Sequence, residues 1–185
     1  MTIRYLSDLH LDHGRLIDVD KRPFASLEEM NEALIQNWNR VVQPEDLTYI
    51  LGDFCYGDGM RWRELLSRLE GRKVLIRGNH DAPASVEAAR DLLEAVDDYM
   101  EIRDRDRKVV LCHYPIVCYR DLLLGSVHLY GHVHAAYDWE LVKEARQRLR
   151  DHYGRADICR MANVGAMLPY MDYTPRTLDE LMPQL

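Results

Sequence analysis

Short apolar runs alternate with segments of helical periodicity along the first half of the chain. The runs with the length and composition of buried strands are residues 2–7, 47–51 and 73–76. Between them, apolar residues recur at helical spacing over residues 26–42 and 60–69, and Ser26 with Glu29 matches a capping box. Repeated strand-helix passages predict parallel strands joined by crossover helices on a central sheet.

The second half of the chain has a more mixed pattern. The expected helices cover residues 84–94 and 139–150, with a short helical piece at 119–123 and a terminal turn capped by Thr177 and Glu180. The expected strands cover residues 99–103, 108–112, 127–130 and 158–164, and a charged turn joins the first two. This order predicts an α/β chain of one domain, residues 1–185, with an antiparallel stretch in its second half.

Polar side chains gather directly after five of the predicted strands. The blocks are Asp8-x-His10, Gly52-Asp53, Gly78-Asn79-His80-Asp81, His113, and Gly131-His132-x-His134. In an open α/β sheet, reactive groups collect in the crevice beyond the carboxyl ends of the strands. We therefore expect these distant segments to form one site. Gly78 suits a tight exit from its strand, where a residue without Cβ adopts backbone angles closed to others.

Composition narrows the function classes. Hydrophobic residues make up 47% of the chain and charged residues 30%, and no apolar run approaches the about 20 residues that span a bilayer. The N-terminus lacks the pattern of a secretory signal, and the four cysteines show no Cys-x-x-Cys spacing. We expect free thiols, no membrane partner and a cytoplasmic location. The net charge of −7 argues against non-specific nucleic-acid coating.

The combined side chains indicate a metal site without thiolate ligands. Carboxylate, amide and imidazole donors suit Mn, Fe, Zn, Co or Ni, and we favour manganese. Two divalent metal ions would use the whole set if Asp53 bridges them. One ion would then take Asp8, His10 and His134, and the other Asn79, His113 and His132.

A pair of bridged metal ions indicates phosphoester hydrolysis. Such a pair lowers the pKa of a bridging water to yield hydroxide and clamps a phosphoryl group for direct in-line attack. His80 follows the predicted ligand Asn79 but is not itself a predicted ligand. It is the expected proton donor to the leaving oxygen or hydrogen-bond donor to the phosphoryl group. Asp81 is expected to orient His80. The expected substrate is a small phosphomonoester or phosphodiester.

These blocks resemble the calcineurin-like metallophosphoesterase family, in small single-domain bacterial and phage form. Its pattern is Asp-x-His, Gly-Asp, Gly-Asn-His-Asp or Glu, His, and Gly-His-x-His, and all five blocks occur in order from residue 8 to residue 134. Arg22-Pro23-Phe24 and Asn163-Val164-Gly165 extend the likeness. The resemblance implies a four-layer α/β-β/α sandwich, a dinuclear centre and the ligand roles given above.

The chain also departs from branches of that family. No Asp-Arg-Gly follows Gly52-Asp53, which argues against a phosphoprotein phosphatase, and 185 residues leave no room for the DNA-capping domain of repair nucleases. Relatives often have Gly-His where this chain has Asp12-His13, so we expect His13 to approach the site. Two alternatives remain: a nuclease or RNA-processing phosphodiesterase, and a non-catalytic scaffold that keeps the fold.

Other polar residues are expected to be structural. His128 lies within a strand and His152 in a helix tail, and neither is assigned to the site. Asn163 is expected to satisfy backbone groups in the turn before Gly165. The substrate's identity, the native metals and the oligomeric state are left open by the residues.

Overall fold

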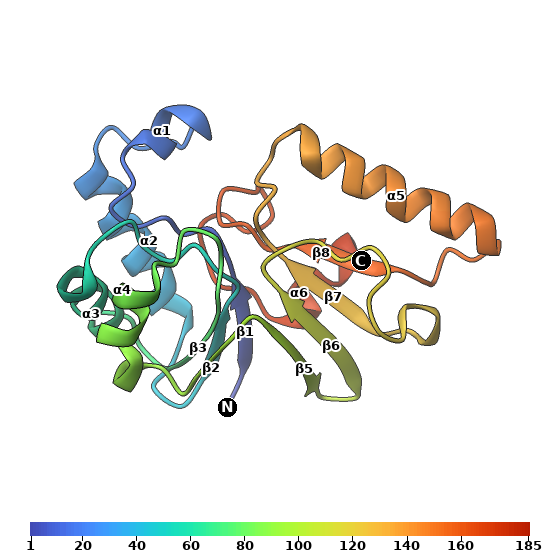
Figure 1. Cartoon of the computed structure of the whole chain (residues 1–185), viewed down its shortest axis with the longest axis horizontal. Coiled ribbons are helices and arrows are strands. Elements are labelled where there is room, and N and C mark those ends of the chain that lie inside the picture. The colour runs from blue at the N-terminus through green and yellow to red at the C-terminus, as the bar shows by residue number, and fades with distance from the viewer.

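Two four-stranded sheets face each other in the computed structural model, which describes residues 1–185 (Figure 1). The first sheet has the order β1-β2-β3-β4 and is parallel throughout. Its strands are β1 (Ile3–Leu6), β2 (Leu47–Ile50), β3 (Arg72–Ile76) and β4 (Ala95–Asp97). Because all four run the same way, their carboxyl ends meet at a single edge.

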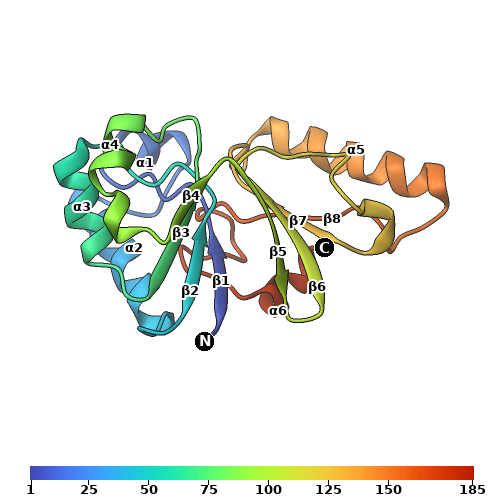
Figure 2. The ribbon, with the colours of Figure 1, turned by 60° about the horizontal axis from the view of Figure 1, so that its bottom comes forward.

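Helices cover the outer face of the first sheet (Figure 2). They are α2 (Leu27–Val41), α3 (Gly59–Ser67) and α4 (Pro83–Ala88), followed by the 3-10 turn Arg90–Leu92, while the short α1 (Arg15–Val19) lies beside the carboxyl edge. The α2 helix begins where Ser26 Oγ accepts a hydrogen bond from the Glu29 N–H at 3.1 Å. The Glu29 side chain accepts a hydrogen bond from the Ala25 N–H. In the expected capping box it would accept from the N–H of Ser26, so the bond is displaced by one residue toward the N-terminus.

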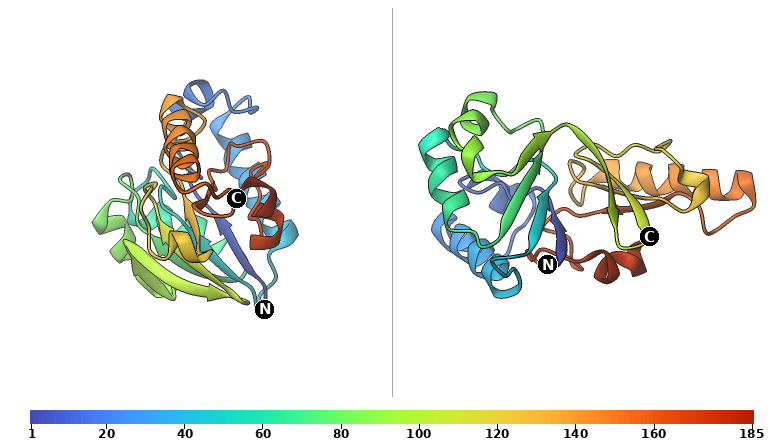
Figure 3. Two further views of the ribbon diagram at one scale, coloured as in Figure 1. Left: turned by 90° about the vertical axis from the view of Figure 1, so that its right-hand side faces the viewer. Right: turned by 90° about the horizontal axis from the view of Figure 1, so that it is seen from below.

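The second sheet has the order β5-β6-β7-β8, and only the β5–β6 pair is antiparallel. Its strands are β5 (Tyr99–Asp104), β6 (Arg107–Cys112), β7 (Val127–Tyr130) and β8 (Arg160–Asn163). The helix α5 (Tyr137–Tyr153) covers its outer side, and the last elements are α6 (Leu178–Leu181) and the 3-10 turn Met182–Gln184 (Figure 3). The expected four-layer α/β-β/α sandwich is confirmed.

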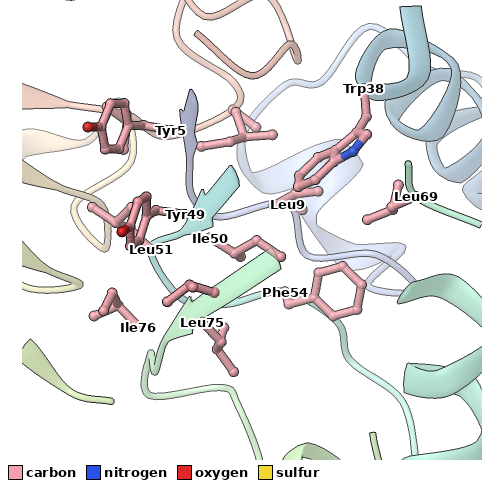
Figure 4. Packing of buried hydrophobic residues seen from close by; sticks show 14 of the residues in the cluster. Tyr5, Leu9, Trp38, Tyr49, Ile50, Leu51, Phe54, Leu69, Leu75 and Ile76 are labelled. Atoms are coloured by element: carbon pink, nitrogen blue, oxygen red, sulfur yellow. The ribbon is translucent and has the colours of Figure 1, made fainter. Parts of the chain in front are cut away.

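Apolar side chains fill both sides of the first sheet. Trp38, Phe54 and Leu69 lie on the side of the helices, whereas Tyr5 and Tyr49 lie on the side of the second sheet (Figure 4). The two tyrosine rings stack with centroids 5.8 Å apart. One cluster of 37 buried residues contains these side chains together with residues of β6, β7 and β8. Burial of this apolar surface holds the two sheets together.

The structure confirms most predicted elements and corrects two regions. The expected helix over 84–94 ends at Ala88, and residues 95–97 form β4, paired with β3 through Val74 and Ala95. A three-residue edge strand is too short to show a period of its own, so its pairing with β3 decides its conformation. The short α1 was also unexpected, because Leu16 is its only buried residue.

The remaining expectations concern the cysteines and the terminal elements. All four cysteines are free, as expected, and Thr177 and Glu180 form the expected capping box at α6. The α5 helix runs three residues further than expected, and Leu141 on this helix is 44% exposed. None of the helices combines the length and apolar character needed to cross a membrane.

Candidate metal centre

The predicted site residues meet at one edge, between the two sheets. Asp8 and His10 follow β1, Asp53 follows β2, and Asn79 follows β3. From the second sheet, His113 follows β6, and His132 and His134 follow β7. Within each sheet, parallel strands bring their carboxyl ends to one edge, and the seven residues come together where the edges of the two sheets meet.

Four of the predicted ligands form a compact, mostly buried half, which we call the buried half: Asp8, His10, Asp53 and His134. One donor atom of each lies within 4.8 Å of every other. His10 Nε2 is 3.2 Å from His134 Nε2 and 3.4 Å from Asp53 Oδ2. His134 Nε2 is 3.5 Å from Asp8 Oδ1. Asp8, His10 and Asp53 are buried and His134 is partly exposed.

The other three predicted ligands form what we call the exposed half: Asn79, His113 and His132. Asn79 Oδ1 lies 3.1 Å from His113 Nε2 and 2.9 Å from His132 Nδ1. His113 is buried, whereas Asn79 and His132 are exposed. His113 Nε2 is also 3.6 Å from Asp53 Oδ2, the oxygen that faces His10. A single carboxylate oxygen therefore stands between the two halves.

The donor atoms fit divalent cations. Ligands about 2.0 to 2.2 Å from one cation lie roughly 3.0 to 3.5 Å from each other, and the distances above fall in or next to that range. His113 Nδ1 faces the Leu51 carbonyl at 2.8 Å and donates to it, so Nε2 presents a lone pair toward the oxygens of Asn79 and Asp53. Acceptors that face acceptors are stabilised by positive charge between them.

The electrostatics of the buried half favour positive charge as well. Burial raises the pKa of the Asp53 carboxyl, and the nearby Asp8 raises it further. Burial lowers the pKa of His10 to about 3, so this imidazole is neutral and can act as a ligand. Burial also acts against a charged His134, but hydrogen bonds to Asp20 and Asp8 outweigh it and raise the pKa of His134 to about 9.

Asp20 and Arg22 support the buried half from outside, and sequence reasoning missed this role. Asp20 Oδ1 lies 2.8 Å from His134 Nδ1, which orients Nε2 toward Asp8. Arg22 is buried, donates to the backbone carbonyls of Asp8 and Leu9 at 3.0 and 2.8 Å, and pairs with Asp20. The sequence signal was Arg22-Pro23-Phe24, noted only as part of the family resemblance.

Glycines in the motifs leave room for the ligands. A Cβ on Gly78 would lie 2.2 Å from Asp53 Oδ1, and one on Gly131 would lie 2.4 Å from Asp8 Oδ2. Gly78 was expected to supply unusual backbone angles, but its φ is not positive. The structure instead requires glycine there because the backbone closely approaches a carboxylate.

Backbone strain is concentrated at the predicted ligands. Five of the seven adopt left-handed backbone angles, with φ between +46° and +69°: Asp8, His10, Asp53, His132 and His134. This conformation is uncommon for residues with a Cβ and costs about 1 kcal/mol or more at each position. Residues held in such conformations cluster at functional sites.

His80 lies exposed at the mouth of the site. Its backbone N–H donates to Asp53 Oδ1 at 2.9 Å, which ties its position to the shared carboxylate. Its ring centroid lies 5.5 Å from that of His10 and 6.1 Å from that of His13. His13 also lies 5.4 Å from His10 between ring centroids, so it approaches the site as expected.

Asp81 contacts backbone rather than the His80 ring that it was expected to orient. Its carboxylate accepts hydrogen bonds from the N–H groups of Asp53, Phe54 and Gly78, at 2.8 to 3.0 Å. Burial raises the pKa of Asp81 to about 6, against the opposing effect of these donors. Asp81 therefore fixes the loop that carries Asp53.

The residues expected to be structural are found in such positions. Asn163 Oδ1 accepts from the Gly165 N–H, and its amide also donates to the His134 carbonyl, each at 2.9 Å. His128 is buried between the Val110 carbonyl and the Ile116 N–H, and His152 is exposed on α5. Asp12 has a φ of +60° and is held by Asn31 and Arg61.

Two open cavities border the site. The first, of about 320 Å³, is lined by Cys55, Tyr56, Gly57, Asp58, His80 and Ala82. The second, of about 490 Å³, lies on the side of α1 and the β7–α5 loop, where Lys21, His132 and His134 contribute to its wall. The first cavity reaches the site through His80, and the second reaches it through His132 and His134.

Comparisons with known proteins give consistent results. A family model described as calcineurin-like phosphoesterase matches residues 1–148. An uncharacterized protein of Methanocaldococcus jannaschii is 36% identical over 135 residues, covering 72% of this chain and 69% of that protein. The gene 66 protein of Mycobacterium phage D29 is 32% identical over 160 residues, covering 71% of this chain and 77% of that protein.

A solved structure shares the whole fold. The structure of a protein of unknown function from Aquifex aeolicus aligns with a TM-score of 0.73 and 24% sequence identity. The alignment covers 100% of this chain and 99% of that one. The likeness concerns the arrangement of the two sheets and their helices.

Proposed function

Because the chain belongs to the calcineurin-like phosphoesterase family, we propose that it is a metal-dependent phosphoesterase that hydrolyses a small phosphomonoester or phosphodiester by direct in-line attack of water. The family match and the cluster of Asp8, His10, Asp53 and His134 support metal-dependent hydrolysis. The substrate class, the metal and the number of ions belong to the proposal.

One observation carries the proposal. Asp53 Oδ2 lies 3.4 Å from His10 Nε2 and 3.6 Å from His113 Nε2, so one oxygen faces both halves of the site. Asp53 would therefore help to hold a divalent ion in either half. When bound, such ions supply Lewis acidity, which activates water and neutralises phosphoryl charge.

The chain's own residues divide the remaining work. Asp8, His10 and His134 would hold a divalent ion in the buried half, and Asn79, His113 and His132 would hold one in the exposed half. His80 donates a proton to the departing ester oxygen, because its exposed ring stands at the mouth while its backbone is tied to Asp53. Asp81 keeps the Asp53 loop in place through three backbone hydrogen bonds.

The two cavities favour a phosphodiester over a phosphomonoester. A diester carries two organic groups on phosphorus, and the cavities of about 320 and 490 Å³ have no lining residue in common. One cavity adjoins His80 and the other adjoins His132 and His134, so each can receive one ester group. A monoester would use only one of them.

The experiment is hydrolysis of bis-p-nitrophenyl phosphate and p-nitrophenyl phosphate by the purified full chain. We expect turnover after addition of Mn²⁺, loss of turnover after chelation, recovery with fresh Mn²⁺, and the higher kcat/KM with the diester. Substituting Fe²⁺, Zn²⁺, Co²⁺ or Ni²⁺ ranks the metals. No hydrolysis of either ester with any metal would contradict the proposal and favour the non-catalytic scaffold.

A further inference from the structure

A single exposed tyrosine borders the cavity beside His80. The Tyr56 side chain is 61% exposed, although it stands on a loop between the buried Cys55 and the helix α3. Isolated surface aromatic residues are common and need no explanation. Tyr56 differs from these because its ring is fixed, lies beside the proposed proton donor and forms part of a cavity wall.

The Tyr56 ring is held by its neighbours. The His13 ring stacks on it with centroids 4.5 Å apart and planes 17° from parallel. The Tyr56 N–H donates to the Leu11 carbonyl at 2.8 Å. The flanking carbonyls are bound too, since Trp62 Nε1 donates to Cys55 and Ser85 Oγ donates to Gly57. His13 contacts the ring and the hydrogen bonds hold its backbone, so stacking on a ligand costs this side chain little conformational freedom.

The cavity offers acceptors next to this ring. The Asp58 carboxylate uses Oδ1 to accept the Arg61 N–H at the start of α3, and no hydrogen bond in the structure engages its Oδ2. The volume of about 320 Å³ is at the lower end for small-molecule sites and admits a flat ring joined to a sugar. A ring with an amino group can stack on Tyr56 and donate to Asp58.

We propose that Tyr56 is a specificity-determining residue that stacks on a nucleobase, so that the preferred substrates are phosphate esters of nucleosides. The proposal rests on the proposed function, because His80 places the leaving alcohol in this cavity. The base lies against Tyr56, and the sugar connects it to the phosphoryl group at the metal ligands.

The test compares substrates that differ only in the base. One pair is adenosine 5′-monophosphate and ribose 5-phosphate, and the other is the two corresponding methyl phosphodiesters. Since stacking of a base on an aromatic side chain gives roughly tenfold in affinity or more, the full chain with Mn²⁺ should show about a tenfold higher kcat/KM for each adenosine ester. Tyr56→Leu should bring that ratio close to one, and Tyr56→Phe should preserve it.

Tyr153→Leu is the matched control, because Tyr153 is 47% exposed at the far end of α5. It should leave the ratio at the wild-type value. No preference for adenosine esters in the wild type, or an unchanged ratio in Tyr56→Leu, would overturn the stacking role.

A binding measurement separates this proposal from the proposed function. Calorimetric titration with adenosine, which has no phosphate to hydrolyse, should show about tenfold weaker binding for Tyr56→Leu than for wild type and for Tyr56→Phe. Hydrolysis of all four esters without a base preference would refute the stacking role of Tyr56 and leave the proposed function standing. Absence of hydrolysis would refute the proposed function, and the titration would still decide the stacking.

Discussion

The two halves of the candidate metal centre are built differently, although Asp53 faces both of them. The buried half has three buried ligands and a further layer of support, in which Asp20 orients His134 and Arg22 binds the Asp8 and Leu9 carbonyls. The exposed half has one buried ligand, His113, fixed by the Leu51 carbonyl, while Asn79 and His132 face solvent. Oriented ligands and exclusion of water strengthen metal binding. We therefore expect the buried half to hold its ion more tightly.

The largest effect should come from the residue that both halves share. Asp53→Asn should reduce the bound metal from two equivalents to less than one and abolish measurable hydrolysis, because the variant lacks the bridging charge. Elemental analysis of protein dialysed against Mn²⁺ measures the occupancy. Asp106→Asn, in the exposed β5–β6 turn, is the control and should keep two equivalents. Two full equivalents in Asp53→Asn would refute the shared role.

His80→Ala should slow turnover without changing either half. A lost general acid lowers kcat by a factor on the order of 10² to 10⁴. The metal content and the unfolding midpoint should stay at wild-type values, because the His80 ring makes no hydrogen bond in the structure and its backbone N–H remains. His152→Ala, on the exposed face of α5, is the matched histidine control. A wild-type kcat would remove His80 from the mechanism.

The variants His132→Ala and His134→Ala should show the metal affinity of each half by itself. His132→Ala removes a ligand of the exposed half and should leave one tightly held equivalent of metal. His134→Ala removes a ligand of the buried half and should leave one equivalent that dialysis readily removes. Titration of each variant with Mn²⁺ against a competing chelator gives both affinities. Equal affinity of the two remaining ions would contradict the difference between the halves.

Asp20→Asn should weaken metal binding in the buried half and leave metal binding in the exposed half unchanged. Loss of an outer carboxylate that orients a ligating histidine typically costs 10- to 100-fold in metal affinity. A two-step Mn²⁺ titration should show the tighter step shifted by this factor and the weaker step unchanged. Asp18→Asn, on the exposed side of α1, should shift neither step. A shift of both steps would show that Asp20 acts on the whole centre.

The smallest effect is on the pH dependence of stability, and it concerns His128, a buried residue of β7 in the second sheet. His128 accepts a hydrogen bond from the Ile116 N–H, in the loop after His113, and burial lowers its pKa to about 4. Below the unfolded-state pKa of about 6.5, the unfolded chain binds a proton that the folded chain does not. This residue therefore makes the free energy of unfolding fall by about 1.4 kcal/mol per pH unit between pH 6.5 and 4.

His128→Gln isolates that contribution. Urea unfolding at pH 7 and pH 5 should show a loss of stability about 2 kcal/mol smaller in the variant than in the wild type, from the slope over 1.5 pH units. The variant keeps an acceptor for the Ile116 N–H, so its fold should persist at pH 7. An identical pH dependence in both proteins would show that folding does not lower the pKa of His128.

The sequence predicted the seven candidate ligands because each stands in a short block directly after a strand. Their convergence follows from the shared direction of the strands, which alternating strands and helices already indicate. Asp20 and Arg22 were missed because their roles depend on contacts with His134 and with the backbone at Asp8. Neither contact leaves a periodic signal in the sequence.

Two other corrections have the same origin. Residues 95–97 become a strand only because the edge of β3 is available to them. Asp81 contacts three backbone N–H groups, and this role depends on how the loops after β2 and β3 pack together. Sequence patterns report local periodicity well, but they contain little information about which loops meet.

The left-handed ligands have an evolutionary consequence. A mutation to glycine at any of these five positions removes a predicted metal ligand and relieves the left-handed backbone strain in the same step. The relief of backbone strain offsets part of the stability that is lost with the contacts of the removed side chain. A related protein that has lost these ligands can therefore still fold and keep the same architecture without catalysis.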